Sequence, residues 1–166
     1  MTTTADSSIP ADPRPVFFAA ADQLVRLIGL ITPEDLGRPT PCDEFDVATL
    51  TGHLLAVLRR ITHVATGGAW ADVPQVVTGI PAEALAATAA SDRDVLVATW
   101  SDDAVLDRVL SLPPGVQVPG RVGALRYTQE MVTHAWDLAT ALGRVDALDA
   151  ALAEPVADAA RRFVPR

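Results

Sequence analysis

The chain has 166 residues, of which 49% are hydrophobic and 20% charged, so its length and composition predict one globular domain rather than a disordered chain. A formal net charge of −8 argues against nucleic acid as a partner, because phosphate groups repel an acidic surface. No apolar run approaches the roughly 20 residues of a membrane-spanning helix, and the single cysteine, Cys42, excludes an internal disulfide. We therefore expect a protein of the reducing cytoplasm without a membrane partner.

Apolar residues at helical spacing divide most of the chain into helices. Residues 1–13 are polar and rich in proline, and we expect a disordered leader there, ahead of a single helical domain over residues 14–166. The predicted helices cover residues 15–31, the stretch from the cap Asp46 to the stop at Gly67, residues 81–100, residues 122–142 and residues 147–164. Before the fourth helix, residues 105–118 hold two short extended segments around a Pro-Gly turn, which is typical of a β-hairpin.

Several helices with little strand predict an all-α fold, a four-helix bundle with a short β-hairpin and an extra C-terminal helix. The last predicted helix runs almost to the end of the sequence, so we allow for a native chain that continues further. The expected aliphatic core includes Leu24, Leu54, Leu58, Leu96 and Val132. We interpret the three tryptophans, Trp70, Trp100 and Trp136, as further core anchors.

Two of the three histidines lie on the second predicted helix, on different sides of it. His53 lies about 40° from Val57 around the helix axis, at the margin of the apolar stripe, and leans toward the interior. His63 lies on the other side of His53, near Arg59, and leans toward water. On helix position alone, a partly buried His53 bonded to a backbone carbonyl is the favoured interpretation.

The third histidine, His134, lies four residues after Glu130, so both side chains project from one face of the fourth helix. This spacing allows a carboxylate and an imidazole to bind one cation, and Asp137 on the same face could orient a ligand. Arg126 shares this face and could engage an anionic substrate. A solvated, salt-bridged helix face explains the same pattern, and from spacing alone it is the favoured interpretation.

No motif for a protein nucleophile or for a bound nucleotide is present, since the sequence has no Gly-x-Ser-x-Gly elbow, Walker loop or Gly-x-Gly-x-x-Gly. Cys42 lies in a turn bounded by proline, away from any predicted helix N-terminus. We interpret it as an incidental or buried thiol rather than a nucleophile.

Two segments together resemble a known family. The first is Thr40-Pro41-Cys42, an aromatic residue at Phe45, and then Leu50-Thr51-Gly52-His53-Leu54. The second is Glu130-Met131-Val132-Thr133-His134-Ala135-Trp136-Asp137, followed by Gly143. Both resemble the signatures of the maleylpyruvate isomerase N-terminal-domain-like group of the DinB superfamily, which includes many uncharacterised actinobacterial proteins. The resemblance runs over nearly the whole chain, with Phe45 where the family usually has tryptophan.

The resemblance implies a DinB-like four-helix bundle with a divalent metal, usually zinc, and mycothiol as cosubstrate. Carried over residue by residue, the metal ligands would be His53, Glu130 and His134. Two histidines and one glutamate leave a coordination position open, which is typical of catalytic zinc. The C-terminal domain of the true isomerases has no counterpart in this sequence, which argues against maleylpyruvate as the substrate.

We therefore expect a metal-dependent mycothiol S-transferase or isomerase-like enzyme whose thiolate attacks a small electrophile. Asp137 would orient His134, and Arg126 would engage an anionic group. Two alternatives stay open: a non-enzymatic helical bundle, for instance a homodimer, and a zinc hydrolase in which the open position holds water.

Overall fold

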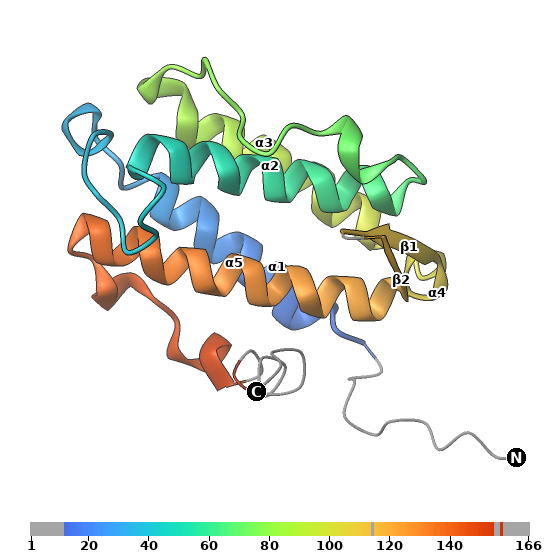
Figure 1. The fold of residues 1–166 in the computed structure, drawn as a ribbon. Coiled ribbons are helices and arrows are strands. Elements are labelled where there is room, and N and C mark those ends of the chain that lie inside the picture. The colour runs from blue at the N-terminus through green and yellow to red at the C-terminus, as the bar shows by residue number, and fades with distance from the viewer. Residues whose placement is uncertain (1–11, 114, 155–156, 158–166) are drawn as a thin grey trace, which may run out of the picture.

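The computed structural model describes residues 12–113, 115–154 and 157. Four long helices form a bundle: α1 (Arg14–Ile28), α2 (Val47–Ala65), α3 (Leu85–Trp100) and α5 (Gly120–Leu142). Helix α1 packs against α3 and α5, and α2 packs against the same two helices, so α1 and α2 lie on one diagonal of the bundle (Figure 1). The predicted all-α bundle is confirmed. Within the described residues, no helix combines the length and hydrophobicity that a membrane crossing requires.

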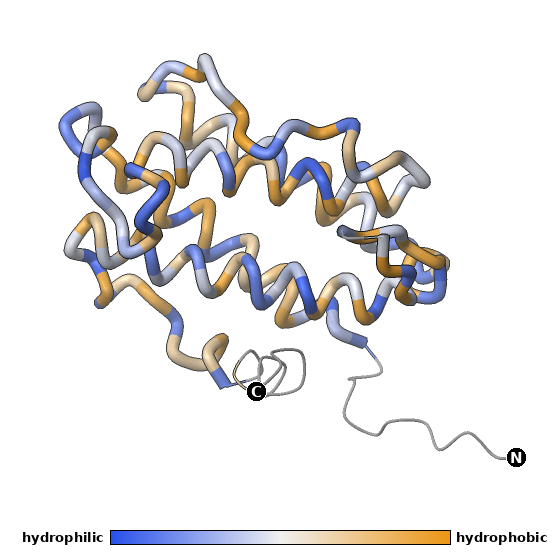
Figure 2. Tube along the Cα trace, viewed as in Figure 1, coloured by the Kyte–Doolittle hydropathy of each residue, from blue (hydrophilic) through white to orange (hydrophobic). Residues whose placement is uncertain are grey.

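Apolar side chains turn inward from all four helices, so the tube in Figure 2 alternates between hydrophobic and hydrophilic residues along each helix. Four of the five predicted core residues, Leu24, Leu54, Leu58 and Leu96, are fully buried. Val132 is only partly buried, and its neighbour Met131 fills the core instead. The inner row of α5 runs through Ala124, Met131 and Ala135, which places Val132 about 100° away at the edge of that row.

The helix boundaries follow local signals. The Asp46 side chain caps α2 by accepting a hydrogen bond from the backbone N–H of Thr49 at 2.8 Å, as predicted. Gly143 ends α5 in the left-handed conformation, with φ of 67°. Helix α1 ends at Ile28, three residues earlier than predicted. The extended backbone of Thr32 ahead of Pro33 prevents continuation, and a short 3₁₀ turn, Pro33–Asp35, follows.

The predicted hairpin closes one end of the bundle (Figure 1). Strand β1 (Val109–Leu112) pairs antiparallel with β2 (Val116–Pro119). A short helix that the sequence pattern did not predict, α4 (Ala104–Asp107), precedes it. A Cβ atom at Gly120 would lie 1.9 Å from the carbonyl oxygen of Val105, so only glycine lets α5 begin against α4.

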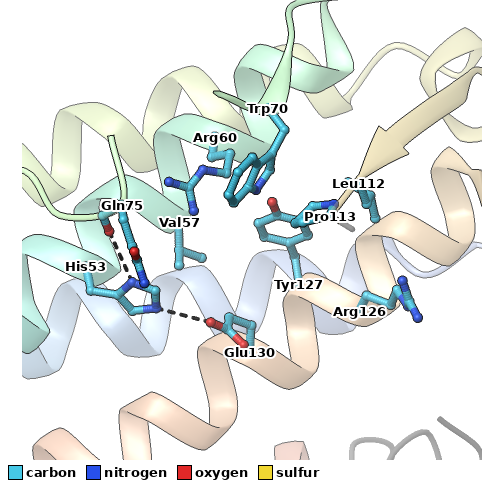
Figure 3. Close-up of a pocket in the computed structure, with 10 residues that line it drawn as sticks. All are labelled: His53, Val57, Arg60, Trp70, Gln75, Leu112, Pro113, Arg126, Tyr127 and Glu130. Atoms are coloured by element: carbon cyan, nitrogen blue, oxygen red, sulfur yellow. Dashed lines mark hydrogen bonds and ion pairs between the residues drawn. The ribbon is translucent and has the colours of Figure 1, made fainter. Parts of the chain in front are cut away.

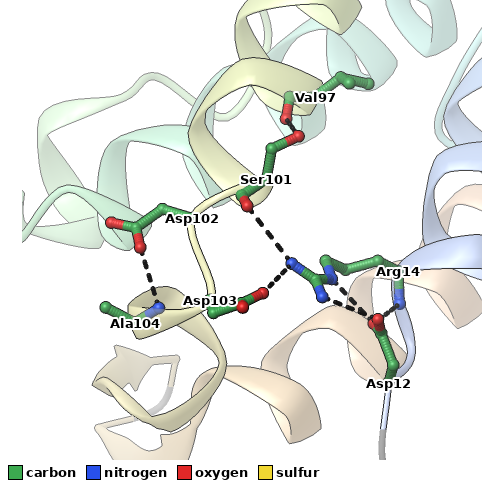
Figure 4. A network of polar contacts seen from close by, with 7 residues as sticks. All are labelled: Asp12, Arg14, Val97, Ser101, Asp102, Asp103 and Ala104. Carbon is green, nitrogen blue, oxygen red and sulfur yellow. Dashed lines mark hydrogen bonds and ion pairs between the residues drawn. The ribbon is translucent and has the colours of Figure 1, made fainter.

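The chain after α5 begins with two 3₁₀ turns, Val145–Ala147 and Ala150–Leu152, where one helix from residue 147 was predicted. Most of that predicted helix, and the predicted leader apart from Asp12 and Pro13, lie outside the described residues. The bounds of the predicted domain therefore stay a prediction. At the other end, Arg14 ties the start of α1 to the end of α3, because its guanidinium meets Asp12, Asp103 and the carbonyl oxygen of Ser101 (Figure 4).

The tryptophans differ in burial. Trp100 is fully buried, with its ring 5.0 Å from that of Phe17, as a core anchor should be. Trp136 is 50% exposed, so its prediction as a core anchor was wrong. It follows the inner residue Ala135 directly, and the 100° helical step turns it outward. Trp70 is partly buried and lines a cavity rather than filling the core.

Candidate metal centre

His53, Glu130 and His134 meet between α2 and α5. The two helices run in opposite directions, which brings the second turn of α2 beside the later turns of α5 (Figure 1). One possible ligand atom from each residue lies within 4.8 Å of the other two. Oε1 of Glu130 lies 3.1 Å from Nε2 of His53 and 3.5 Å from Nε2 of His134. The structure thus brings together all three residues that the resemblance implied as metal ligands.

A hydrogen bond at Nδ1, the nitrogen that points away from Glu130, orients each imidazole ring. Nδ1 of His53 lies 3.2 Å from the carbonyl oxygen of Gln75, and Nδ1 of His134 lies 2.9 Å from Oδ2 of Asp137. A carbonyl and a carboxylate only accept hydrogen bonds, so each Nδ1 carries the proton. In a neutral ring the free electron pair is then on Nε2, which faces Glu130 in both cases.

This donor set fits a divalent metal. Two neutral Nε2 atoms and a carboxylate oxygen would place electron pairs against one another unless a proton or a cation lies between them. The hydrogen bonds from His134 and His53 hold the pKa of Glu130 at about 2, so it is a carboxylate at neutral pH. The same Glu130 carboxylate raises the pKa of His134 above its usual value. A divalent cation between the two Nε2 atoms and the carboxylate would remove the same repulsion.

The α5 face that carries these residues is solvated only in part, since Thr133 is exposed and the Glu130 side chain is 44% exposed. Asp137 is buried, at 7% exposure, and His134 is partly buried. Both lie on the side of α5 that faces α2, so these two polar side chains point into the molecule. The ring of His134 stands edge-on to that of His53, with 5.0 Å between centroids. His63 lies apart as predicted, paired with Asp72 at 2.9 Å on the surface.

Glycine at position 52 lets a loop cross α2 beside His53. The backbone N–H of Val77 donates to the carbonyl oxygen of Gly52 at 3.0 Å. A Cβ atom at residue 52 would lie 2.3 Å from the carbonyl oxygen of Val77, so no larger residue fits. The same loop carries Gln75, whose carbonyl orients His53. Gly52 was not predicted as a site residue, although a glycine inside a helix indicates that another segment approaches closely.

The segment before α2 supplies a further contact to the cluster. The ring of Phe45 lies 5.6 Å from that of His53, so the aromatic position of the first signature packs on a ligand candidate. Cys42 is partly exposed in the preceding turn, where its backbone N–H donates to Oγ1 of Thr40. It is not a member of the His53, Glu130 and His134 group.

A cavity of about 360 Å³ opens beside the cluster (Figure 3). Its lining residues come from α2, α5, the loop after α2 and the hairpin: His53, Val57, Arg60, Trp70, Gln75, Leu112, Pro113, Arg126, Tyr127 and Glu130. Arg126 lies at the hairpin end, far from His53 in Figure 3. Tyr127 is buried, which raises its pKa to about 12, so it stays a neutral phenol.

Three lining residues, Arg60, Trp70 and Tyr127, were missed as site residues in the sequence analysis. Arg60 follows His53 by seven residues, and Tyr127 precedes Glu130 by three. Both spacings place a side chain on the same helix face as the ligand candidate. The pattern was therefore present in the sequence, but it indicates a site only once the two faces are known to meet.

Comparisons with known proteins place the chain in a family and agree with its fold. The family model for the mycothiol maleylpyruvate isomerase N-terminal domain matches residues 17–139. The uncharacterized proteins Rv0738 and MT0763 of two Mycobacterium tuberculosis strains are each 32% identical over 156 residues, covering 92% of this chain and 80% of their own length.

Among solved structures, the mycothiol-dependent maleylpyruvate isomerase matches with a TM-score of 0.60 at 17% identity. A mutant of that enzyme matches with 0.58 at 15% identity. Each match covers 76% of this chain, and this chain spans 59% of the isomerase chain.

Fold and comparisons together define a DinB-like helical bundle that carries a cluster of two histidines and a glutamate between two of its helices. The chain belongs to the mycothiol maleylpyruvate isomerase N-terminal domain family.

Proposed function

We propose that this protein is a metal-dependent enzyme that uses mycothiol to attack a small electrophile, as an S-transferase or an isomerase-like catalyst. Its metal, which we propose is zinc, would be held by His53, Glu130 and His134. The observation that carries the proposal is the convergence of two Nε2 atoms and one carboxylate oxygen. Each of the two rings is oriented by a hydrogen bond at its Nδ1 atom. Family membership supports mycothiol as the thiol.

The chain's own residues would prepare the site before any ligand arrives. The carbonyl of Gln75 and the carboxylate of Asp137 hold the two Nδ1 protons, so both Nε2 electron pairs stay directed at one point. Glu130 adds one negative charge, and its low pKa keeps it deprotonated. When bound, a divalent metal would lower the pKa of a thiol at its open position and so supply a thiolate near neutral pH.

Transfer of the sulfur to the electrophile needs no oxidant, reductant or other reagent. The thiol loses its proton to solvent, the sulfur forms a bond to the electrophilic carbon, and the leaving group departs with its electron pair. An isomerase-like reaction would instead add the sulfur and later expel it. The cavity beside the cluster is the space for the electrophile, and Arg126 at its hairpin end would meet an anionic group of it. No protein nucleophile is required, so Cys42 has no role in the step.

We propose small electrophiles as a class rather than one named substrate. This chain spans 59% of the isomerase chain it resembles, and the likeness of the two at 17% identity is one of fold. We therefore do not propose maleylpyruvate as its substrate. The absence of disulfide-forming cysteine pairs in the sequence is compatible with the reducing cytoplasm, where we place the reaction.

Metal and thiol binding by the purified chain test the proposal. We expect about one divalent ion per chain, lost in His134→Ala and retained in His63→Ala, because His63 lies outside the cluster. The metal-loaded protein should bind mycothiol with release of a proton, measured by calorimetry in two buffers of different ionisation enthalpy. Cys42→Ser should bind the thiol equally well.

Other outcomes identify the rival functions. Metal binding without mycothiol binding, combined with ester hydrolysis that Glu130→Gln abolishes, would identify a hydrolase instead. Neither metal nor thiol binding, with a stable dimer in solution, would identify a non-enzymatic bundle. Equal loss of metal from the His134 and His63 variants would contradict the ligand assignment.

A further inference from the structure

Arg60 is a buried cation in the wall of the cavity. Its residue is only 5% exposed, and its guanidinium carbon lies 4.5 Å above the centre of the Trp70 ring. Nη2 donates to the carbonyl oxygens of Val73 at 3.0 Å and Pro74 at 2.8 Å. Nε is buried and has no hydrogen-bond partner among the described residues. Part of the donor capacity of this guanidinium is therefore unused.

No carboxylate of the described residues lies within ion-pair distance of Arg60, although the chain has 21 acidic residues against 13 basic ones. Its neighbour Arg59 has such a partner, with Nε 2.7 Å from Oδ2 of Asp92. Arginines elsewhere are also paired with aspartate: Arg14, Arg38, Arg93, Arg121 and Arg144. A buried charge without a counter-charge is unfavourable, so the position of Arg60 in the cavity wall requires an explanation.

The position of Arg60 relative to the metal centre explains why a cation is buried in the cavity wall. His53, Val57 and Arg60 follow the spacing i, i+4 and i+7 on α2, so they lie in a row along one face (Figure 3). Seven residues of α-helix correspond to about 10 Å along the axis. A ligand in the cavity can thus have one end at the His53 cluster, pass over Val57, and reach the guanidinium with its other end.

We propose that Arg60 is the anchor of an anion-binding subsite, and that the ligand of this cavity carries a carboxylate or similar anionic group at the end remote from the metal centre. The anion supplies the negative charge that no described residue provides and meets the part of the guanidinium that lines the cavity, while Trp70 packs on the guanidinium. The role of the near end as a metal-binding thiol or its electrophilic partner rests on the proposed function. The anion subsite itself does not depend on the proposed function.

A purely structural role makes a different prediction. If Arg60 only holds the carbonyls of Val73 and Pro74, its loss loosens the loop. The affinity of the cavity for every ligand then falls by the same factor. The discriminating quantity is therefore the preference for a charged ligand over a neutral one of the same shape, and not affinity alone.

Octanoate and octanamide form such a pair of probes. Their binding to the full chain is followed by the NMR signal of the Trp70 indole N–H, before and after zinc loading. We expect octanoate to bind at least about tenfold more tightly than octanamide. In Arg60→Gln the two affinities should become about equal, and in Arg60→Lys part of the preference should remain. The matched control Arg59→Gln, which changes the adjacent paired arginine, should keep the full preference.

Each other result overturns the proposal. Equal binding of the two probes to the unchanged chain, binding of neither, or a preference that survives Arg60→Gln would show that Arg60 is not an anion anchor. An equal loss of affinity for both probes in Arg60→Gln would show that Arg60 has only the structural role. With zinc present, 8-mercaptooctanoate should bind more tightly than octanoate. If 8-mercaptooctanoate binds no more tightly than octanoate, while the preference for octanoate still depends on Arg60, the proposed thiol-binding site is wrong and the anion subsite is supported.

Discussion

The carbonyl oxygen of Gln75 lies 3.2 Å from Nδ1 of His53, and this contact depends on a helix and a loop that cross at a single glycine. The carbonyl oxygen of Gly52 accepts the backbone N–H of Val77 at 3.0 Å, which fixes the loop on the helix surface two residues after Gln75. The orientation of one ligand candidate therefore depends on the residue before it in the sequence.

Gly52→Ala tests this dependence. The added methyl group would lie 2.3 Å from the carbonyl oxygen of Val77, so the loop must move and take the Gln75 carbonyl away from His53. We expect metal affinity to fall by about 10–100-fold, as for the loss of other groups that orient a ligand. Overpacking should also lower the free energy of unfolding by about 1–3 kcal/mol. A chelator competition assay and chemical denaturation measure the two effects.

Gly37→Ala is the matched control. A Cβ atom there meets nothing within 4 Å, and the residue is exposed. Its metal affinity and stability should stay close to those of the unchanged chain. If Gly52→Ala behaves like Gly37→Ala, the crossing does not orient His53.

Asp137 holds the second ring in the same way, and its charge can be removed without changing its shape. In Asp137→Asn, the acceptor of the His134 Nδ1 proton becomes a neutral amide, which lowers the basicity of Nε2 and allows the ring to turn. We expect about 10–100-fold weaker metal binding with the fold retained, as seen by circular dichroism. Asp146→Asn, on an exposed turn, is the control. Equal metal affinity for both variants would remove Asp137 from the site.

The apolar stripes predicted much of the bundle because they report helical periodicity directly. Leu24, Leu54, Leu58 and Leu96 were assigned to the core from spacing alone, and all four are fully buried. Trp136 shows the limit of assignment by residue type, since a large aromatic one helical step from the inner row remains half exposed. Val132 was also assigned from spacing and is only partly buried, because the inner row of α5 passes through its neighbour Met131.

The candidate site could be predicted only in part. Spacing shows that Glu130 and His134 share a face, but 77 residues separate Glu130 from His53, and only the family resemblance brought the three together. Spacing places Arg60 within about 20° of His53 around the helix axis and Arg59 about 100° further round, but it does not show what packs on Arg60. The loop after α2 supplies these contacts, because it places Trp70 and two carbonyls around Arg60, whereas Arg59 pairs with Asp92 on α3.

The contacts of Arg14 and the core of the bundle should contribute very differently to stability. Arg14 makes several polar contacts with Asp12, Asp103 and Ser101, but in exposed positions where solvent screens the charges (Figure 4). Arg14→Ala should therefore change the free energy of unfolding little. Leu58→Ala removes a fully buried side chain and should cost about 2–5 kcal/mol. Urea denaturation of both variants checks the contrast, and a larger loss in Arg14→Ala would contradict it.

The pH dependence of the metal-free protein follows from two opposite shifts in the cluster. The pKa of Glu130 is lowered from 4.5 to about 2, so its contribution to stability is present above pH 4.5 and is lost as the pH falls toward 2. The pKa of His134 is raised from 6.5, so its contribution is present below pH 6.5 and is lost as the pH rises through the raised value. Stability from the cluster should therefore be largest between about pH 4.5 and 6.5.

Chemical denaturation of the metal-free chain and of Glu130→Gln, over a series of pH values, measures this contribution as a difference. The difference should be largest in that window and should shrink on both sides, because the amide that replaces the carboxylate has no charge to pair with His134. Metal should bind more tightly as the pH rises through the raised pKa of His134, since each ion then displaces fewer protons. A stability difference that does not vary with pH would show that Glu130 and His134 are not electrostatically coupled.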